Sequence, residues 1–449
     1  MKKDFYQKEF KDKKITIMGL GVLGRGLQVT ELLASSGAKV TVTDLKSEKD
    51  LQTSIKALKK FNINYVLGKH DVADFENTDL IVKSAGVPLD SIYIKHARDH
   101  KVPVIMDASL FARLVNKVTP KVTVVGVTGT RGKSMTTALI YHILNMNQKK
   151  LKCKIHLGGN MRMKATLPLI SKVNPGDIVV LELDSWQCQG FGDEKLSPNI
   201  AVFTSFMPDH MNYYKDSMKD YLNDKSNIFR FQKKGDVLVI HKDLLKIVPK
   251  RYKGTALTSD LKKVSKIPMH IFGDHNIQNA AYAYTVAKRV GLSEKDITTA
   301  LSSFIGLEGR LEYVGKVKGV NIINDNNATT PEATVAGIEA VSLKYTKGKI
   351  ILITGGADKK LDLKNLIKSI EKNKVQRVSL QGKGTERLKP YLTTKYEEYP
   401  TLKEVVKGAF ALAKKDDVIL FSPGFASFGL FIHEYDRNDQ FLSIIKKWK

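Results

Sequence analysis

The sequence predicts an α/β protein in which helices cover parallel β-sheets. Short apolar segments indicate strands, for example residues 14–19, 39–44 and 80–86, and helix-like segments lie between them. This alternation is typical of parallel sheets, because a parallel connection needs a crossover of helix length. The 449 residues are enough for two to four domains, at roughly 100–200 residues each.

The pattern of strands and helices restarts twice along the chain. A second series begins at residues 122–129 (VTVVGVTG) and a third near residues 313–327. Each restart follows a helix-like segment, residues 110–118 in one case and 297–307 in the other. We therefore expect three domains, at residues 1–108, 109–308 and 309–449.

A glycine loop, GLGVLGRG, spans residues 19–26 in the first predicted domain. It follows a predicted strand and opens a helix, and Gly19, Gly21 and Gly24 have the spacing of a dinucleotide-binding turn. Asp44 ends the next strand, where its carboxylate could accept a hydrogen bond from a ribose hydroxyl. The loop predicts a Rossmann-like domain. A nicotinamide dehydrogenase and a packing turn without a ligand would show the same pattern.

A second glycine loop, GVTGTRGKS, spans residues 126–134 and departs from the usual P-loop spacing. Val127 stands five places before Gly132, where the P-loop pattern has a glycine. Glycines let backbone N–H groups turn toward a phosphate, Lys133 adds a positive charge, and Ser134 offers a hydroxyl to Mg²⁺. A lysine at a helix N-terminus is unfavourable unless an anion is present. The loop therefore predicts a central nucleotide-binding domain.

Acidic side chains follow the next two predicted strands of the central domain. Glu182 and Asp184 come after one apolar strand, and Asp209 and His210 come after the other. Mg²⁺ prefers oxygen ligands, so the carboxylate of Glu182 suits it better than an imidazole. By spacing alone, His210 would be a hydrogen-bonding residue of the core.

The composition narrows the kinds of partner. The net charge of +27 admits nucleic acid or anionic small substrates, but the lysines are spread along the chain without an arginine cluster or an aromatic RNA-binding motif. Two cysteines give neither a zinc-site spacing nor a disulfide framework. No apolar run approaches the roughly 20 residues of a membrane span, and no apolar segment follows the basic N-terminus. We therefore expect a cytoplasmic protein that binds neither nucleic acid nor membranes.

The second loop continues as GVTGTRGKSMTT, which is similar to the G-[IV]-T-G-T-x-G-K-[ST]-T-T loop of the Mur ligase family. Other motifs of the family follow in the same order, at residues 158–160 (GGN), 181–189 (LELDSWQCQ), 209–210 (DH), 221–229 (YLNDKSNIF), 273–280 (GDHNIQNA), 355–362 (GGADKKLD) and 422–428 (SPGFASF). The chain most resembles the branch that joins D-glutamate to UDP-N-acetylmuramoyl-L-alanine. Many short motifs in one order are far more specific than any one of them.

The resemblance implies an ATP-dependent ligase of peptidoglycan synthesis that works as a monomer. Its Rossmann-like first domain would hold the UDP-sugar rather than a redox cofactor, its P-loop-type central domain would hold ATP, and its Rossmann-like third domain would bring the amino acid. ATP would phosphorylate the substrate carboxylate to an acyl phosphate. The amine of the amino acid would then attack, and phosphate would leave through a tetrahedral intermediate.

The resemblance also implies roles for individual residues. Direct participants in catalysis are expected to be Lys133, Glu182, His210 and Lys225. The expected ATP-binding residues are Gly129, Thr130, Gly132, Lys133, Ser134, Thr136, Asn276, Asn279, Arg310 and Asp325. The residues expected to hold the UDP-sugar are Gly21, Val22, Leu23, Asp44, Ser84 and Asn160. The residues expected to hold the incoming amino acid are Lys359, Ser427 and Phe428.

Two Mg²⁺ ions are expected by the same resemblance. Ser134 and Glu182 would hold the first ion, and His210 the second. Lys225 matches the family lysine that reacts with CO₂ and becomes a carbamate, which turns a cation into an oxygen ligand for Mg²⁺. Without the motif around it, Lys225 would be one more solvated lysine on a helix.

The chain departs from the family pattern mainly in the third domain. The positions that differ are Arg131, Tyr213, Gly309, Asn326, Asn327, Thr330 and Gly429. Asn327 replaces a lysine and Gly429 replaces an aspartate of the usual pattern. Most ATP-binding positions of the central domain match, whereas several positions near the amino acid do not. A Mur-type ligase with another acceptor, and an ATP-binding homologue that has lost transfer, therefore stay open.

Overall fold

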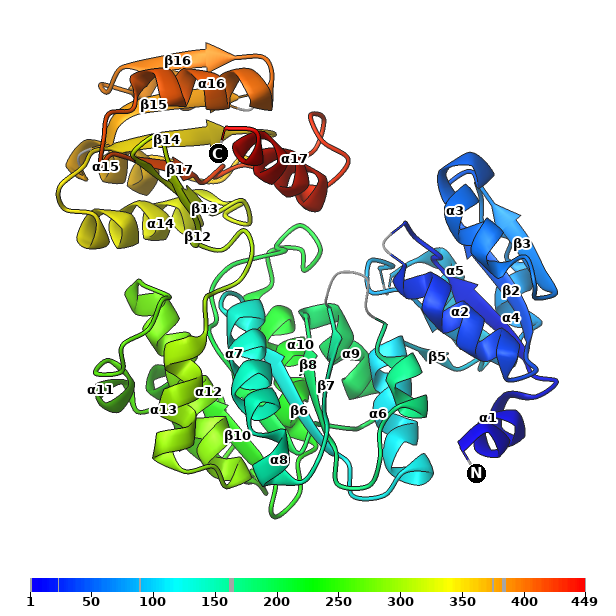
Figure 1. The fold of residues 1–449 in the computed structure, drawn as a ribbon. Helices are drawn as coiled ribbons and strands as arrows, with labels where there is room; N and C mark the ends of the chain where they lie inside the picture. Colours follow the sequence, from blue (N-terminus) through cyan, green and yellow to red (C-terminus); the bar gives the residue numbers. More distant parts are fainter. Residues whose placement is uncertain are drawn as a thin grey trace. The chain divides into compact units, whose positions relative to one another are not determined.

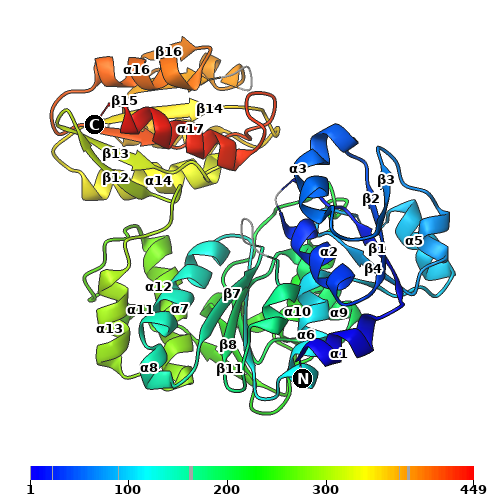
Figure 2. The same ribbon diagram turned by 45° about the vertical axis from the view of Figure 1, so that its right-hand side comes forward.

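The computed structural model describes residues 2–22, 24–88, 90–160, 165–373, 375–381 and 385–448. The chain forms two compact units (Figures 1 and 2). The first consists of Met1–Lys266 with Gln278–Leu301, and the second of Ile267–Ile277 with Ser302–Lys449. Within the described residues, no helix is both long and apolar enough to cross a membrane.

The first unit begins with a five-stranded parallel sheet in the order β3-β2-β1-β4-β5. Its strands are β1 (Lys14–Met18), β2 (Lys39–Asp44), β3 (Ile63–Leu67), β4 (Leu80–Lys83) and β5 (Val104–Ile105). Its helices are α1 (Lys2–Phe10), α2 (Arg25–Ser35), α3 (Glu48–Leu58), α4 (Ala73–Glu76) and α5 (Ile92–Asp99). The chain first adds β2 and β3 on one side of β1 and then adds β4 and β5 on the other side, which is the strand order of Rossmann-like sheets. The predicted Rossmann-like first domain is confirmed.

A six-stranded parallel sheet follows, in the order β11-β10-β9-β6-β8-β7. Its strands are β6 (Thr123–Thr128), β7 (Ile155–Gly159), β8 (Ile178–Glu182), β9 (Ile200–Phe203), β10 (Val237–Ile240) and β11 (Thr255–Thr258). The helices are α6 (Asp107–Val118), α7 (Lys133–Met146), α8 (Gln148–Leu151), α9 (Ser185–Asp193), α10 (Met218–Arg230), α11 (Leu261–Val264), α12 (Asp274–Val290) and α13 (Glu294–Ser303), with 3₁₀ turns η1 (Leu167–Ser171) and η2 (Lys242–Ile247). Every residue of β8 is buried, as expected for a parallel strand covered on both faces.

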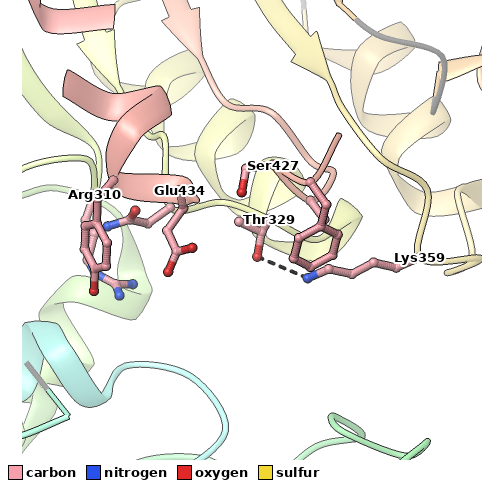
Figure 3. Close-up of a pocket in the computed structure, with 9 residues that line it drawn as sticks. Arg310, Thr329, Lys359, Ser427 and Glu434 are labelled. Atoms are coloured by element: carbon pink, nitrogen blue, oxygen red, sulfur yellow. Dashed lines mark hydrogen bonds between the residues drawn. The ribbon is translucent and has the colours of Figure 1, made fainter. Parts of the chain in front are cut away.

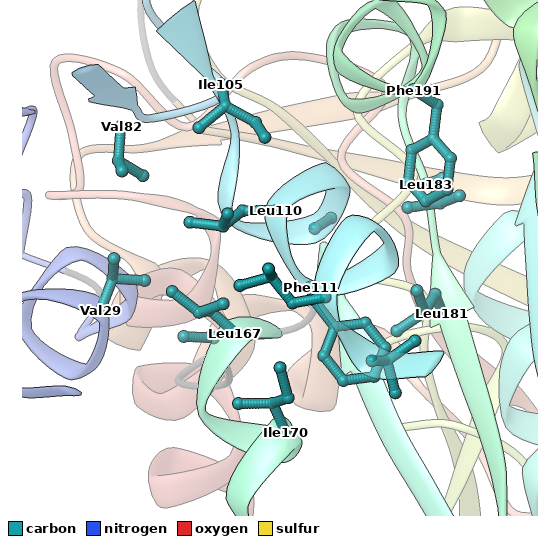
Figure 4. Close-up of a cluster of buried hydrophobic side chains, with 14 of the residues drawn as sticks. Val29, Val82, Ile105, Leu110, Phe111, Leu167, Ile170, Leu181, Leu183 and Phe191 are labelled. Carbon is teal, nitrogen blue, oxygen red and sulfur yellow. The ribbon is translucent and has the colours of Figure 1, made fainter. Parts of the chain in front are cut away.

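One hydrophobic core joins these two sheets within the first unit (Figure 4). Val29 of α2 and Val82 of β4 belong to the same buried cluster as Leu110 and Phe111 of α6, and Leu181 of β8. The predicted boundary between residues 108 and 109 lies in the first turn of α6, whose side chains pack into this shared core. The three-domain division with its stated bounds stays a prediction.

The second unit contains a six-stranded sheet in the order β12-β13-β17-β14-β15-β16. Its strands are β12 (Glu312–Val317), β13 (Val320–Asn324), β14 (Ile350–Gly355), β15 (Val375–Gln381), β16 (Tyr396–Tyr399) and β17 (Val418–Phe421). Its helices are α14 (Pro331–Lys344), α15 (Lys364–Lys372), α16 (Leu402–Leu412) and α17 (Glu434–Lys446), with the 3₁₀ turn η4 (Lys389–Tyr391). Neighbouring side chains of one strand enter opposite cores: Ile322 lies in the cluster with Val405 and Phe441, and Ile323 in the cluster with Ile338.

The first strand of this sheet is antiparallel to the second, which the expected βαβ pattern does not include. β12 and β13 form a hairpin through Lys318 and Gly319, and both residues have positive φ, at 49° and 80°. Two consecutive positive φ values give the turn whose twist matches that of paired strands. The remaining strand pairs are parallel, so the predicted α/β class is confirmed.

Candidate active site

The loop at residues 129–132 connects β6 to the start of α7. Gly129 and Gly132 have φ of 146° and 85°, which L side chains rarely adopt. A Cβ atom on Gly129 would lie 2.0 Å from Thr204 Oγ1, and one on Gly132 would lie 2.5 Å from Asn279 Oδ1. The loop therefore needs both glycines to pack against its neighbours. Helix α7 starts at Lys133 with no side-chain cap from Gly132, which suits the binding of an anion by its first N–H groups.

Two lysines meet at this loop. Lys133 Nζ donates to Gly129 O at 2.9 Å and to Thr130 O at 3.0 Å. Lys225 Nζ, from α10, donates to the same Gly129 O at 2.8 Å. Lys225 is 1% exposed, so it is not the solvated helix lysine that its spacing alone would indicate.

The electrostatics of the two lysines follow from this burial. Loss of hydration and the nearby charge of Lys133 lower the pKa of Lys225 to about 7. Burial also lowers the pKa of Lys133, although the carboxylates of Glu182 and Asp184 oppose the shift. Lys225 therefore has a large neutral-amine fraction near neutral pH.

The predicted metal ligands follow β8 and β9, the two strands that flank β6 in the central sheet. Glu182 is buried at the end of β8, and His210 follows β9 with a positive φ of 56°. The His210 side chain is 40% exposed and its ring centroid lies 4.8 Å from that of Trp186, so it is not the core residue that spacing alone would indicate. Burial lowers the pKa of His210, which favours the neutral imidazole that can ligate a metal.

The donor atoms at these strand ends suit Mg²⁺ only in part. Among the described residues, Glu182 and His210 do not gather with a third carboxylate, imidazole or thiol within 4.8 Å. Mg²⁺ requires mostly oxygen ligands. The Ser134 hydroxyl and the Glu182 carboxylate would supply them, and a carbamate on Lys225 would supply more. With that modification, the chemistry of these donor groups would suit Mg²⁺.

Arg131, where the family usually has asparagine, is held at the edge of the loop. Its Nη1 donates to Asp209 Oδ2 at 2.7 Å, and its backbone N–H donates to Ser205 Oγ at 2.8 Å. The guanidinium charge is therefore balanced by a carboxylate beside the loop. This pairing explains how the loop accommodates an extra positive side chain.

Four of the residues expected to hold the UDP-sugar, Gly21, Val22, Asp44 and Ser84, lie at the carboxyl ends of strands of the first sheet. Gly21 N and Lys46 N each donate to the Asp44 carboxylate, at 2.9 Å, and a Cβ atom on Gly19 would lie 2.5 Å from Ser84 Oγ. These contacts bring the ends of β1, β2 and β4 together. Val22 is 47% exposed, whereas Leu23 lies outside the described residues.

Asn160 links this region to the central sheet. Its Oδ1 accepts from Arg25 Nη1 at 2.7 Å, and its backbone N–H donates to Glu182 O at 2.7 Å. Arg25 is a basic residue that was not singled out from the sequence, although it lies inside the first glycine loop. A positive side chain at the start of α2 would have been the signal for it.

Asn279, on α12, lies beside the nucleotide loop: its Oδ1 accepts from Thr136 Oγ1 of α7 at 3.2 Å, and it is the nearest side chain to the Cβ position of Gly132. Asn276 lies in the first turn of α12, the part of that helix that belongs to the second unit, and its Nδ2 donates to Phe272 O at 3.0 Å. Asp325 is buried in the same unit and accepts from Ser422 Oγ at 2.8 Å and Leu311 N at 3.2 Å. Burial raises the pKa of Asp325 to about 7. The nucleotide contacts expected of Asn276, Arg310 and Asp325 stay predictions.

A pocket of about 290 Å³ lies in the second unit (Figure 3). Its lining residues are Arg310, Asn327, Thr329, Lys359, Ala426, Ser427, Phe428, Glu434 and Tyr435. Lys359 Nζ donates to Thr329 Oγ1 at 3.5 Å. The structure thus brings Lys359, Ser427 and Phe428, the three residues expected to bind the amino acid, into one pocket. Arg310 adds a second cationic side chain there, and Glu434 adds a carboxylate.

Thr329, Glu434 and Tyr435 line this pocket but were not singled out from the sequence. Asn326, a departure from the family pattern, helps to place Glu434, because its Nδ2 donates to Glu434 O at 2.9 Å. Asn326 also accepts from Arg437, a fully buried arginine, through its side-chain and backbone oxygens at 2.8 Å each. No short motif marks Glu434, and only its position at the start of α17 brings it to the pocket.

Comparison with known proteins agrees with this arrangement. Residues 13–106 match the family described as "Mur ligase MurD-like, N-terminal domain", residues 127–256 the "Mur ligase middle domain", and residues 309–425 the "Mur ligase, glutamate ligase domain". The chain is 34% identical to the "UDP-N-acetylmuramoylalanine–D-glutamate ligase" of Borreliella burgdorferi (strain ZS7), over 97% of this chain and 98% of that protein. It is 32% identical to the protein of the same description from Roseiflexus sp. (strain RS-1), over 97% and 99%.

Solved structures show the same fold. The UDP-N-acetylmuramate-alanine ligase MurC from Thermotoga maritima has a TM-score of 0.62 at 18% identity, over 97% of this chain and 100% of that one. The MurF ligase from Thermotoga maritima in complex with ADP has a TM-score of 0.59 at 18% identity, over 98% and 96%. Identities this low support the fold alone. The identity and coverage of the sequence relatives show more: the chain belongs to the Mur ligase family of ATP-dependent, amide-bond-forming ligases.

Proposed function

We propose that this ligase adds D-glutamate to UDP-N-acetylmuramoyl-L-alanine with ATP, through an acyl phosphate and a tetrahedral intermediate. The observation that supports this most directly is the identity of 34% over 97% of the chain to a ligase described by that reaction. We also propose that it acts as a monomer in the cytoplasm, where ATP and UDP-activated sugars are available. The reaction forces two anions together, so the site must supply positive charge.

The loop at residues 129–134 is proposed to receive the phosphates of ATP. When ATP binds, Lys133 Nζ would exchange its hydrogen bonds to the carbonyls of Gly129 and Thr130 for hydrogen bonds to phosphate oxygens. Hydrogen bonds between two charged groups are stronger than those to a neutral carbonyl. Ser134, Glu182, His210 and carbamylated Lys225 would hold Mg²⁺, which neutralises phosphate charge when bound. The N–H groups at the start of α7 would orient the phosphates in line with the substrate carboxylate.

Lys225 is proposed to be carbamylated. The neutral amine attacks CO₂ to form an N–C bond, and one proton leaves, so that Lys–NH₂ and CO₂ become Lys–NH–COO⁻ and H⁺. A lysine with a pKa of about 7 has the neutral amine that this step needs. Carbamylation would also replace one of the two adjacent cations by an anion and so relieve their repulsion.

The pocket of the second unit is proposed to bind the amino acid. Glutamate carries two carboxylates and one ammonium, and the pocket presents Lys359 as a cation, Glu434 as an anion and the Ser427 hydroxyl as a donor. Arg310, whose expected partner is the nucleotide, adds positive charge to the same pocket. Burial of a second carboxylate without such partners would be costly. The charge pattern therefore favours an acidic acceptor over a neutral one, despite the departures at Asn327 and Gly429.

A panel of acceptors tests the proposed function. Purified protein would be given ATP, Mg²⁺, UDP-N-acetylmuramoyl-L-alanine and one of D-glutamate, L-glutamate, D-alanine or L-lysine. ADP release and the product mass would be measured. We expect an amide product with D-glutamate above all. Better turnover with a neutral amino acid would overturn the D-glutamate assignment, and ATP binding without any product would favour a homologue that has lost transfer.

A further inference from the structure

A group of metal-ligating side chains lies in the first sheet's helices, apart from the residues discussed so far. Among the described residues, Glu76, His96 and His100 place one ligand atom each within 4.8 Å of one another. His96 Nε2 lies 2.9 Å from Glu76 Oε2, and His100 Nε2 lies 3.2 Å from the same oxygen. The two histidines are one helical turn apart at the end of α5, and Glu76 ends α4.

A hydrogen bond at one ring nitrogen of His100 determines the protonation of the other ring nitrogen, which faces the Glu76 carboxylate. Its Nδ1 lies 2.9 Å from His96 O, which can only accept, so Nδ1 carries the hydrogen. In the neutral ring, Nε2 then carries a lone pair and faces Glu76 Oε2, which is an acceptor as well. Two acceptors at 3.2 Å need a cation between them, either a proton or a metal ion. A backbone carbonyl on the other ring nitrogen is a common partner of a metal-bound histidine.

The distances suit a small tetrahedral ion. At metal–ligand distances of about 2.0–2.1 Å, ligand atoms of a tetrahedral zinc site lie about 3.3 Å apart. The two separations from Glu76 Oε2, 2.9 and 3.2 Å, are close to that spacing. The side chains of Glu76, His96 and His100 are 31%, 32% and 46% exposed, which leaves water access for a fourth ligand.

Both helices that carry the ligands are held by the core. Phe75 precedes Glu76 and Ala97 follows His96, and both are fully buried in one cluster with Ile94. Ligands next to buried residues lose little freedom on binding. The two histidines also lie at the C-terminal end of α5, where the helix dipole favours a cation.

We propose that Glu76, His96 and His100 form a binding site for a divalent transition-metal ion, with zinc as its physiological occupant. Glu76 lies just before β4 begins at Leu80, and His100 lies just before β5 begins at Val104. Gly19, Asp44 and Ser84 instead lie at the carboxyl ends of parallel strands. The ion would therefore bind at the opposite edge of the first sheet from the residues proposed to hold the substrate, and would tie α4 to α5 without taking part in the reaction.

Zinc titration of the untagged full-length protein tests the site. The protein would be stripped with EDTA, exchanged into chelator-free buffer, and given excess Mg²⁺ to occupy the magnesium positions. Calorimetry with Zn²⁺ would count the sites, and the visible absorption of added Co²⁺ would report tetrahedral coordination. The variants are Glu76→Gln and His100→Ala. His270→Ala, an exposed histidine of the second unit, is the matched control.

We expect the wild type and His270→Ala to bind one Zn²⁺ more than Glu76→Gln or His100→Ala, or to bind it at least about tenfold more tightly. Zn²⁺ should raise the Tm of the first two proteins more than that of the two site variants. Glu76→Gln conserves size, so its Tm without metal separates loss of binding from loss of fold. Equal zinc binding and equal Tm shifts in all four proteins would overturn the proposal and leave an ordinary His–Glu ion pair. The ligase activity of His100→Ala in Mg²⁺ should equal that of the wild type. The zinc test and the acceptor panel therefore report on different sites, and either proposal can fail while the other stands.

Discussion

At the scale of single residues, Lys133 provides the sharpest test of the nucleotide loop. Lys133 is the first residue of α7, and its ammonium donates hydrogen bonds to the carbonyls of Gly129 and Thr130. We expect Lys133→Ala to lower kcat by about a hundredfold or more, the usual cost of removing one preorganised contact to developing charge. Steady-state ADP release would measure it.

The control for this variant is Lys172→Ala, which removes an exposed lysine directly after η1 in the same unit. It should leave turnover unchanged. Circular dichroism should show that both variants are folded. Near-normal turnover of folded Lys133→Ala would mean that ATP binds elsewhere.

Lys225 predicts a dependence of activity on pH and CO₂. Its pKa of about 7 means that the amine is mostly protonated at about pH 6 and mostly neutral at about pH 8. Because only the neutral amine attacks CO₂, activity should rise with pH through this range and should rise further with added bicarbonate below about pH 7. Rates in buffers with and without bicarbonate would measure the effect, and ¹³C-bicarbonate would give a carbamate signal by NMR.

The variant Lys225→Ala should be nearly inactive and insensitive to bicarbonate. Lys219→Ala, an exposed lysine of the same helix α10, should keep the activity and the pH profile of the wild type. A short added carboxylate should restore part of the activity of Lys225→Ala. Full activity in that variant would remove the carbamate from the mechanism.

Lys359 tests the amino acid pocket at the same scale. It lines the pocket of the second unit with Ser427 and Glu434 (Figure 3). Lys359→Ala should raise the KM for D-glutamate by about tenfold or more, the worth of one charge-assisted hydrogen bond. The KM for ATP should change far less, because the side chain acts on one substrate. A rise in the KM for ATP alone would assign Lys359 to the nucleotide instead, and an equal rise in both constants would rule out a role specific to the amino acid.

At the scale of elements, the connection from β6 to α7 depends on close packing as well as on conformation. Gly129→Ala would introduce a Cβ atom 2.0 Å from Thr204 Oγ1 at a φ of 146°. We expect a loss of about 1–3 kcal/mol in the free energy of unfolding, from strain of this kind, and a clear loss of ADP binding. Urea unfolding and calorimetry with ADP would measure both quantities.

Gly176→Ala separates the two causes. Gly176 also has a positive φ, of 87°, but a Cβ atom added there would have no atom of the described residues within 4 Å, apart from the adjacent residues of the chain. This control should lose stability through its backbone alone and should keep ADP binding. If Gly129→Ala bound ADP as tightly as the control, the loop would not cradle the phosphates.

At the scale of the whole molecule, the first two sheets share one core, so we expect them to unfold together (Figure 4). Phe111 of α6 is fully buried in the cluster that also contains Val29 and Leu181. Phe111→Ala should lower the free energy of unfolding by about 3–5 kcal/mol, because it removes apolar contacts and leaves a cavity. Leu343→Ala, at a side chain that is 75% exposed, should change it by less than about 0.5 kcal/mol. Urea unfolding followed by circular dichroism would compare them.

The sequence by itself determined the α/β class and the two glycine loops. Both are local properties: alternating apolar segments identify parallel strands, and Gly129, Gly132 and Lys133 act through their spacing along a few residues. The order of motifs also determined the family. The hairpin at Lys318 and Gly319 was not foreseen, because two positive φ values in one turn are decided by strand pairing as much as by residue type.

Only the tertiary structure decided which distant residues meet. Lys225 reaches the Gly129 carbonyl across 96 residues of chain, and burial at that contact lowers its pKa. Glu434 enters the pocket with Lys359 and Ser427 through the start of α17, and Glu76 meets His96 and His100 through the packing of α4 on α5. Such contacts depend on how elements far apart in the sequence pack against one another, whereas spacing along the chain records only neighbours.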